Sequence, residues 1–389
     1  MAEEVVIVSA ARTPIGKFGR GMRSVSAVTL GTIAAQAAVT RSGLDPAMIQ
    51  QTIFGTVLQA GLGQNVARQI ELNVGLPVTS TAMTINQVCG SSLKAIRLGQ
   101  TAILMGDADA VLVGGTESMS QAPYLNNRSR WGHKFGDVSL TDSLTRDGLT
   151  DAFTHVPMGI TAENVAERFN VSREAQDAFA LNSQQKAVAA QKHFQFNDEI
   201  VPVPVGDELI TQDEAVRANT SLEKLAALRP AFRADGTVTA GNAAGLNDGA
   251  AAMVLMRKST AQAANIPYLA TLTGYHENGI DPDIMGYAPV YAIQDVLDQH
   301  HLRVNDIDRY EINEAFASQS VAIARDLKLP SEKLNVNGGS IALGHPLGAS
   351  GTRIVVTLLH ELLHSDLHRG LAAMCIGGGM GIALLLERD

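Results

Sequence analysis

The sequence predicts an α/β protein built from two similar halves, and three observations support this. Short apolar runs alternate with helical patterns along the 389 residues, which is typical of parallel strands covered by helices. Hydrophobic residues make up 46% of the chain and charged residues 18%, a balance that favours a well-buried fold over a disordered or fibrous one. A strand, a turn and a helix also recur about 260 positions apart, as duplication would produce.

The predicted elements of the first half follow in chain order. Val5–Val8 is expected to form a buried strand, and the alanine-rich segment Leu30–Ser42 a helix. A second helix is predicted over Leu93–Met105, where apolar residues recur at helical spacing. The buried strand Val111–Val113 follows and ends in Gly114–Gly115.

The second half repeats the end of the first. Gly348–Gly351 precedes a predicted helix over Thr352–His364, and the strand Ala373–Ile376 then ends in Gly377–Gly379. Two copies favour a duplicated α/β half over a solenoid, although glycine-rich turns also recur by chance in α/β proteins. We assign residues 1–265 to an N-terminal half and residues 266–389 to a C-terminal half.

A more polar stretch, about residues 118–248, separates the two halves. It contains the only tryptophan, Trp131, and a predicted helix that begins after Ser172, where Gln176 and Asp177 continue the start signal. We expect this inserted region to cover a ligand or to form an oligomer contact.

Composition excludes several classes of protein. The net charge is 30 − 39 = −9, so no general basic field attracts nucleic acid. Two cysteines rule out a disulfide framework and fit a reducing compartment. No signal peptide and no apolar run long enough for a membrane span are expected, which favours the cytoplasm.

Cys89 is the first candidate for catalysis. It lies between a strand pattern and the helix over Leu93–Met105, and the residues that follow, Gly90, Ser91 and Ser92, are small. A thiol at a helix N-terminus is expected to have a lowered pKa, which favours the thiolate. The alternative is a buried structural cysteine, the common fate of a lone cysteine in a hydrophobic chain.

His345 lies in the glycine-rich segment Asn335–Gly351. Histidine can take a proton from a thiol near neutral pH, and glycine-rich turns let the backbone approach a ligand closely. A single histidine is more often a satisfied structural residue, so the glycines around this one are what single it out.

Two further residues stand at strand ends. Cys375 precedes Gly377–Gly379, whose N–H groups could stabilise an anion, and it is a candidate acid/base or a core residue. Asn313 follows the strand-like Tyr310–Ile312 and could hold an oxyanion or a water, or cap a helix over Ala317–Leu327.

Signals for cofactors and metals are poor. The sequence has no P-loop and no dinucleotide-binding fingerprint. His360 and His364 are four residues apart on a predicted helix but have no clear third ligand, so we expect no metal and no cofactor.

Taken together, these segments resemble the thiolase family nearly from end to end. The matching segments, in chain order, are Ser9–Gly16, Asn86–Leu93, Gly114–Met119, Gly245–Ala250, Asn313–Phe316, Asn337–Gly351 and Cys375–Ala383. The resemblance implies the thiolase fold, with two βαβαβαββ halves in a layered α/β/α/β/α core and an inserted loop domain. It also implies a homodimer or a homotetramer.

The same resemblance implies a role for each candidate. Cys89 would be the nucleophile, acylated on sulfur and activated by His345, while Cys375 would move the proton of the substrate carbon. Asn313, through a water, would join His345 in one oxyanion hole. The N–H groups of Cys89 and Gly377 would form the other.

Recognition of coenzyme A (CoA) is also implied by the family. Four basic residues and one acid fall between Arg217 and Arg233, and Arg217 aligns with a CoA-contacting arginine of biosynthetic thiolases. Apolar positions that align around the pantetheine and acyl group are Leu149, Met158, Phe232, Met285 and Phe316. Ala244 stands where relatives often carry a pantetheine-contacting serine, and Ser92 stands where glycine is usual.

The leading expectation is an acetyl-CoA C-acetyltransferase, which converts two acetyl-CoA into acetoacetyl-CoA and CoA. The segment Asp147–Glu163 is similar to the short-chain biosynthetic branch. The alternatives are a degradative 3-ketoacyl-CoA thiolase, a ketoacyl synthase of the same fold, and a non-catalytic CoA-binding homologue. The second cysteine, Cys375, argues against the synthase.

Overall fold

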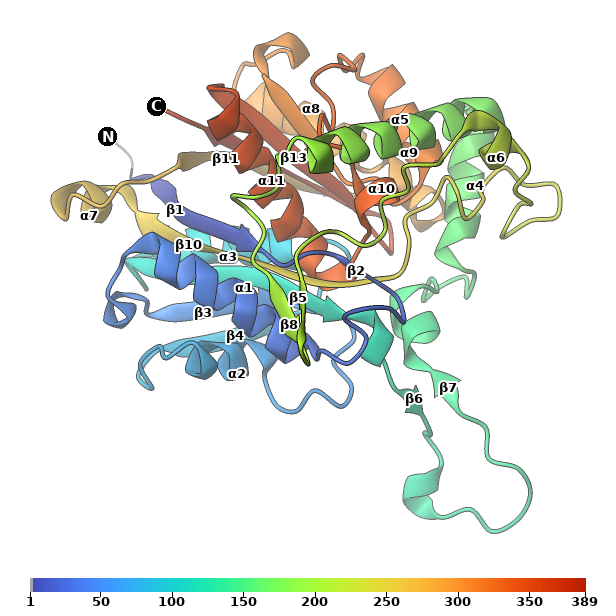
Figure 1. Ribbon diagram of the computed structural model, residues 1–389, viewed down its shortest axis with the longest axis horizontal. Coiled ribbons are helices and arrows are strands. Elements are labelled where there is room, and N and C mark those ends of the chain that lie inside the picture. The colour runs from blue at the N-terminus through green and yellow to red at the C-terminus, as the bar shows by residue number, and fades with distance from the viewer. Residues whose placement is uncertain (1–2) are drawn as a thin grey trace.

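The computed structural model describes residues 3–389, and its ten-stranded sheet runs through both halves of the chain (Figure 1). The strands of the first half are β1 (Val5–Arg12), β2 (Gly16–Lys17), β3 (Gln51–Gly55), β4 (Thr81–Ile85), β5 (Ala110–Ser118) and β10 (Asn247–Arg257). Those of the second half are β11 (Ala270–Gly279), β12 (Arg309–Ile312), β13 (Arg369–Ile376) and β14 (Met380–Glu387).

The two halves have the same strand order. In the first half β3 is parallel to β4 and β5, and β10 runs antiparallel to both β5 and β1. In the second half β12 is parallel to β13, and β14 runs antiparallel to both β13 and β11. Leu334 makes a parallel bridge to Tyr310, where β4 would stand in the first half. The duplicated βαβαβαββ fold predicted from the sequence is therefore confirmed.

Helices form three layers around the two half-sheets. They are α1 (Ala27–Ser42), α2 (Val66–Asn73), α3 (Ser91–Met105), α7 (Lys258–Ala263), α8 (Pro289–Gln299), α9 (Ala317–Asp326), α10 (Ser340–Leu343) and α11 (Ser350–His364). Helices α1 and α2 cover the outer face of the first half, and α8 and α9 that of the second. Between the half-sheets α3 contacts α11, and Leu93, Ile96 and Leu359 are fully buried in one shared core.

Small residues let α3 and α11 come together at their N-termini. A Cβ on Gly351 would lie 2.4 Å from the backbone nitrogen of Leu93, so a larger residue there would push the helices apart. The Thr352 N–H donates to Ser92 Oγ at 2.8 Å. Ser92, the departure from the usual glycine, thus adds a hydrogen bond between the two central helices.

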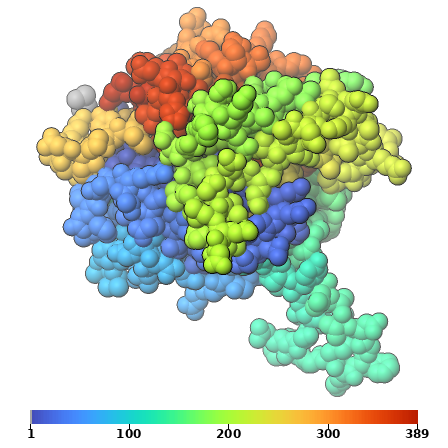
Figure 2. Space-filling view, in the orientation of Figure 1, coloured from blue at the N-terminus to red at the C-terminus, as the bar shows by residue number. Residues whose placement is uncertain are grey.

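The inserted region lies between β5 and β10. Its elements are β6 (Tyr124–Leu125), β7 (Thr141–Asp142), a π-helical turn (Leu144–Gly148), α4 (Met158–Arg168), α5 (Arg173–Lys192), β8 (Val203–Val205), β9 (Glu208–Ile210) and α6 (Leu222–Ala226). The segment between β6 and β7 projects away from the body and leaves Trp131 89% exposed (Figures 1 and 2). The predicted start of α5 is confirmed, since Ser172 Oγ accepts from the Ala175 N–H.

Over residues 3–389, none of the helices combines the length and the apolar character needed to cross a bilayer.

Candidate active site

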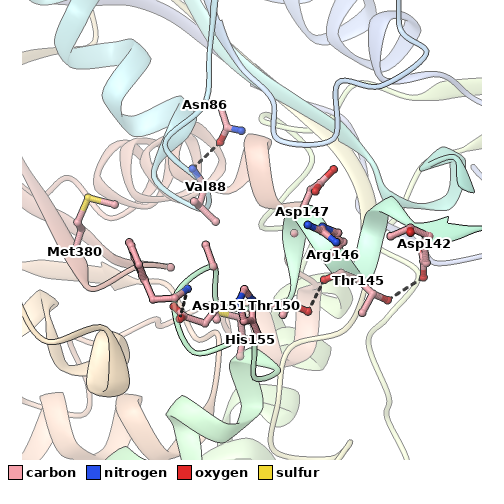
Figure 3. Close-up of a pocket in the computed structure, with 17 residues that line it drawn as sticks. Asn86, Val88, Asp142, Thr145, Arg146, Asp147, Thr150, Asp151, His155 and Met380 are labelled. Atoms are coloured by element: carbon pink, nitrogen blue, oxygen red, sulfur yellow. Dashed lines mark hydrogen bonds between the residues drawn. The ribbon is translucent and has the colours of Figure 1, made fainter. Parts of the chain in front are cut away.

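Cys89 lies in a strained turn between β4 and α3. Val88, directly before it, has a φ of 47°, a left-handed conformation that a β-branched residue rarely adopts. The Asn86 side chain accepts from the Val88 N–H at 2.9 Å and holds this turn (Figure 3). The sequence analysis did not identify Val88 as part of the site, because no residue pattern indicates a positive φ at a valine.

Cys89, His345 and Gly377 line one cavity of about 70 Å³. This inner cavity shares Val88, Gly148, Met158 and Gly377 with an outer groove of about 1410 Å³ (Figure 3). The groove is lined mainly by the inserted region. A ligand that enters along the groove would therefore reach the sulfur of Cys89.

The predicted lowering of the Cys89 pKa is wrong. Burial raises the pKa of this thiol to about 12, and the neighbouring Cys375 adds to the rise. The N–H groups of Gly377 and Cys89 lower the pKa, but by less than burial raises it. The thiol is 8% exposed, so loss of hydration outweighs the helix terminus. A neutral thiol needs a base to become a nucleophile.

His345, in the lining of the same cavity, is the candidate for that base. Its Nδ1 lies 2.6 Å from Ser350 Oγ, and the Ser350 hydroxyl donates to the carbonyl of Pro346 at 2.8 Å. Since the hydroxyl has one hydrogen, Nδ1 must donate to Ser350, which leaves Nε2 without a proton. Nε2 is buried and has no hydrogen-bond partner within residues 3–389. Burial, together with the charge of Arg353, lowers the pKa of His345 to about 3.

These two shifts predict a flat pH profile for acylation. His345 stays neutral above its lowered pKa of about 3, and Cys89 stays protonated below its raised pKa of about 12. Neither changes charge between about pH 5 and about pH 9, so the rate should vary less than about twofold there. The measurement is the rate of Cys89 acetylation by acetyl-CoA, followed by intact mass. A rise centred near the ordinary thiol pKa of about 8.5 would contradict the neutral pair.

Cys375 lies at the end of β13 and is fully buried beside Met285 and Ala315. The Gln319 side chain contacts its sulfur at 3.3 Å through Nε2 and at 3.4 Å through Oε1. Burial raises the pKa of Cys375 to about 11, and the contact with Gln319 opposes the rise. Cys375 in turn raises the pKa of Cys89. Sequence reasoning did not single out Gln319.

Asn313 is not a helix cap, so that interpretation is wrong. The N-cap residue of α9 is Phe316, which makes no capping bond through its side chain. Asn313 is instead fully buried, and its Oδ1 accepts from Ser340 Oγ at 2.6 Å. Its Nδ2 is a buried donor that finds no acceptor in the described part of the chain.

Of the residues expected around CoA, five line the inner cavity, and they are Leu149, Met158, Ala244, Met285 and Phe316. Phe232 packs edge-on against Phe316, with ring centroids 6.4 Å apart. Arg217 lies elsewhere. It is exposed in a separate groove along α5, where its backbone N–H donates to the side chain of Gln184. The apolar set is thus brought together at Cys89, and Arg217 is outside it.

Metal-binding clusters are absent from the described residues: no group of three or more His, Cys, Asp or Glu side chains between residues 3 and 389 could hold an ion.

Comparison with known proteins agrees with this geometry. Residues 5–259 match the family described as "Thiolase, N-terminal domain", and residues 266–388 match "Thiolase, C-terminal domain". A Staphylococcus aureus (strain COL) protein named probable acetyl-CoA acyltransferase is 52% identical over 389 residues, with 99% of each chain covered.

Solved structures of two kinds of thiolase are about equally similar. The Bacillus anthracis acetyl-CoA acetyltransferase has a TM-score of 0.96 at 42% identity, covering 99% of each chain. The human mitochondrial 3-ketoacyl-CoA thiolase has a TM-score of 0.97 at 43% identity, covering 100% of this chain and 99% of that one. With both family domains matched and a full-length relative at this identity, the chain belongs to the thiolase family of acyltransferases.

Proposed function

We propose that this thiolase is an acetyl-CoA C-acetyltransferase, which reversibly joins two acetyl-CoA into acetoacetyl-CoA and CoA. The observation that carries the proposal is the inner cavity of about 70 Å³ at Cys89. Pockets for larger ligands span about 300–1,000 Å³, so this cavity suits a small group. Apolar side chains such as Leu149 and Met285 close it, which suits an acetyl group better than a long chain.

In the first half-reaction, His345 Nε2 takes the proton of Cys89, and the thiolate attacks the carbonyl carbon of acetyl-CoA. The N–H groups of Cys89 and Gly377 stabilise the oxyanion, because they already converge on the sulfur. The carbon–sulfur bond to CoA then breaks, and Cys375 protonates the leaving thiolate. The products are acetyl-Cys89, free CoA, protonated His345 and the Cys375 thiolate.

In the second half-reaction, the Cys375 thiolate takes a proton from the methyl group of a second acetyl-CoA. Protonated His345 and a water held by Asn313 donate to the enolate oxygen. The enolate carbon attacks acetyl-Cys89, and the bond between the acetyl carbon and the Cys89 sulfur breaks. The Cys89 thiolate takes back the proton from His345, which returns the enzyme to its starting state.

Turnover across chain lengths tests the substrate. Thiolysis of acetoacetyl-CoA is expected to be on the order of 10²-fold more efficient in kcat/KM than thiolysis of 3-ketohexadecanoyl-CoA, because a long chain exceeds the inner cavity. Cys89→Ala is the blank for both substrates. A preference for the long chain would replace the proposal with a degradative 3-ketoacyl-CoA thiolase, to whose human mitochondrial form the chain is equally similar.

The oligomeric state and the cytoplasmic location expected from the sequence stay predictions.

A further inference from the structure

The orientation of one buried amide decides whether the second oxyanion hole works. A side-chain amide presents a donor at one end and an acceptor at the other, and a half-turn exchanges them. The Nδ2 of Asn313 must face the reacting oxygen or its bound water, because Oδ1 there would repel an enolate. The amide is fully buried, and the contacts around it therefore fix its orientation.

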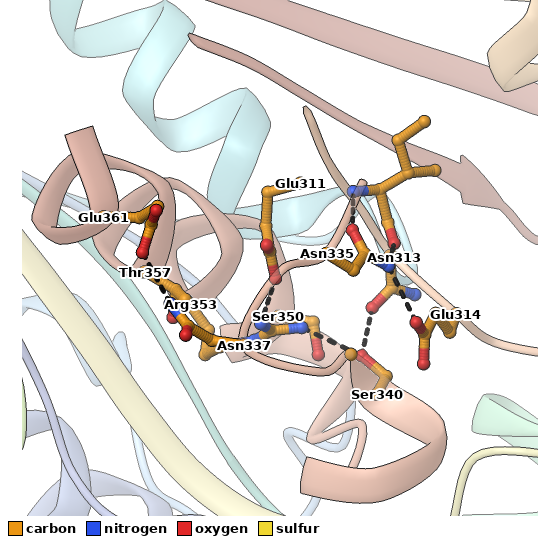
Figure 4. Close-up of polar contacts among 12 residues, drawn as sticks. Glu311, Asn313, Glu314, Asn335, Asn337, Ser340, Ser350, Arg353, Thr357 and Glu361 are labelled. Carbon is orange, nitrogen blue, oxygen red and sulfur yellow. Dashed lines mark hydrogen bonds and ion pairs between the residues drawn. The ribbon is translucent and has the colours of Figure 1, made fainter. Parts of the chain in front are cut away.

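Ser340 fixes the orientation of the Asn313 amide (Figure 4). Arg353 Nη2 donates to Ser340 Oγ at 3.0 Å, and Ser340 Oγ lies 2.6 Å from Asn313 Oδ1. A guanidinium has only donors, so the serine oxygen must accept from it. The single hydroxyl hydrogen is then directed to Asn313, and only an amide oxygen can receive it. Nδ2 is left as the free donor, and within residues 3–389 it has no partner.

Arg353 is itself held rigidly. It is 2% exposed, and its Nη1 donates to Glu311 at 2.8 Å. It lies on α11 one turn after Ser350, whose hydroxyl orients His345. The first turns of α11 therefore act on both groups that meet the enolate oxygen: Ser350 orients His345, and Arg353 acts on Asn313 through Ser340 of α10.

We propose that Ser340 and Arg353 are positioning residues, which fix the amide of Asn313 with its N–H side toward the enolate. The proposal rests on the function proposed above, because only the carbon–carbon bond-forming step uses this donor. The acylation of Cys89 uses the N–H groups of Cys89 and Gly377 and does not need Asn313. The two half-reactions should therefore respond differently when Ser340 is changed.

The test is Ser340→Ala in the full chain. Without the hydroxyl, the amide of Asn313 can turn, and kcat for thiolysis of acetoacetyl-CoA is expected to fall about 10- to 100-fold, up to the usual loss of one oxyanion donor. Acetylation of Cys89 by acetyl-CoA, followed by intact mass, should stay within about threefold of the unchanged protein. Ser340→Thr, which keeps the hydroxyl, should restore most of the turnover.

Ser183→Ala is the matched control. Ser183 is equally buried, and its hydroxyl accepts from Gly339 N–H at 3.1 Å and donates to Glu314 at 2.6 Å. It thus supports the same turn before α10 without touching Asn313. This variant should keep its turnover, and its thermal midpoint should match that of Ser340→Ala.

A second comparison separates positioning from a general structural effect. In an Asn313→Ala background, Ser340→Ala should cause no further loss, because Ser340 acts only through Asn313. Additive losses, or equal slowing of both half-reactions, would overturn the role of Ser340. An unchanged protein that forms no acetyl-Cys89 adduct would instead contradict the proposed function itself.

Discussion

Replacing Cys89 with alanine is expected to abolish turnover, with kcat for thiolysis of acetoacetyl-CoA falling about 10⁴-fold or more. The reason is that both half-reactions of the proposed mechanism pass through a thioester on this sulfur. The sulfur of the other cysteine, Cys375, is approached by its own backbone N–H, whereas the N–H groups of both Gly377 and Cys89 converge on the sulfur of Cys89. Thiolysis is measured by the loss of acetoacetyl-CoA, and the adduct by intact mass after acetyl-CoA is added.

Ser92→Gly is the control for this substitution. Ser92 lies three residues from Cys89 and loses only its hydrogen bond from the Thr352 N–H, and glycine is usual at this position in the family. It should therefore keep turnover within about threefold and still form the adduct. Measurable turnover or an acetyl adduct in Cys89→Ala would mean that another residue carries the acyl group.

Much of the fold could be predicted because its signals are local. Apolar residues at helical spacing mark α3 and α11, and a run of glycines marks the end of β13. The predicted end of the earlier strand at Gly114–Gly115 is wrong, because β5 continues through these glycines to Ser118. The similarity between residues 89–115 and 348–379 then indicates the duplication. What the sequence could not indicate is that β1 and β11 join the halves into one sheet through only two residue pairs.

The sequence singles out the candidate catalytic residues but does not predict their electrostatics. Cys89, His345 and Cys375 stand beside glycines that mark turns, which is a local signal. The pKa of Cys89 depends instead on how much water folding removes, and burial by distant segments reverses the effect expected from the helix terminus. A helix N-terminus favours the thiolate of a cysteine, but at Cys89 burial has the larger effect on the pKa.

The residues missed by sequence reasoning act through contacts between distant segments. Gln319 reaches Cys375 across 56 positions, and Ser340 reaches Asn313 across 27. A buried serine or glutamine has no distinctive pattern in sequence, so its partner becomes visible only in the fold. The same reason explains why the sequence favoured a helix cap at Asn313. Its position before α9 suits a cap, but its side chain contacts Ser340 instead.

Replacing Cys375 with alanine is expected to lower condensation and thiolysis by about 10²- to 10⁴-fold, the usual contribution of a general acid or base. The methyl group of acetyl-CoA is a weak acid, and the raised pKa of Cys375, about 11, makes its thiolate a stronger base than an ordinary cysteine thiolate. Cys375→Ser keeps the shape of the side chain and should lose as much, which distinguishes lost proton transfer from a new cavity.

Acylation of Cys89 should survive the same substitution, slowed by about tenfold or less. In the proposed mechanism Cys375 protonates the leaving CoA thiolate in that step, but a thiolate with a pKa of about 8.5 leaves readily without help. The adduct should therefore accumulate in Cys375→Ala when acetyl-CoA is added, because the next step cannot remove it. Full turnover in this variant would contradict the thiolase assignment of the second cysteine. Loss of the adduct as well would mean that Cys375 supports Cys89 itself, since Cys375 already raises the pKa of Cys89.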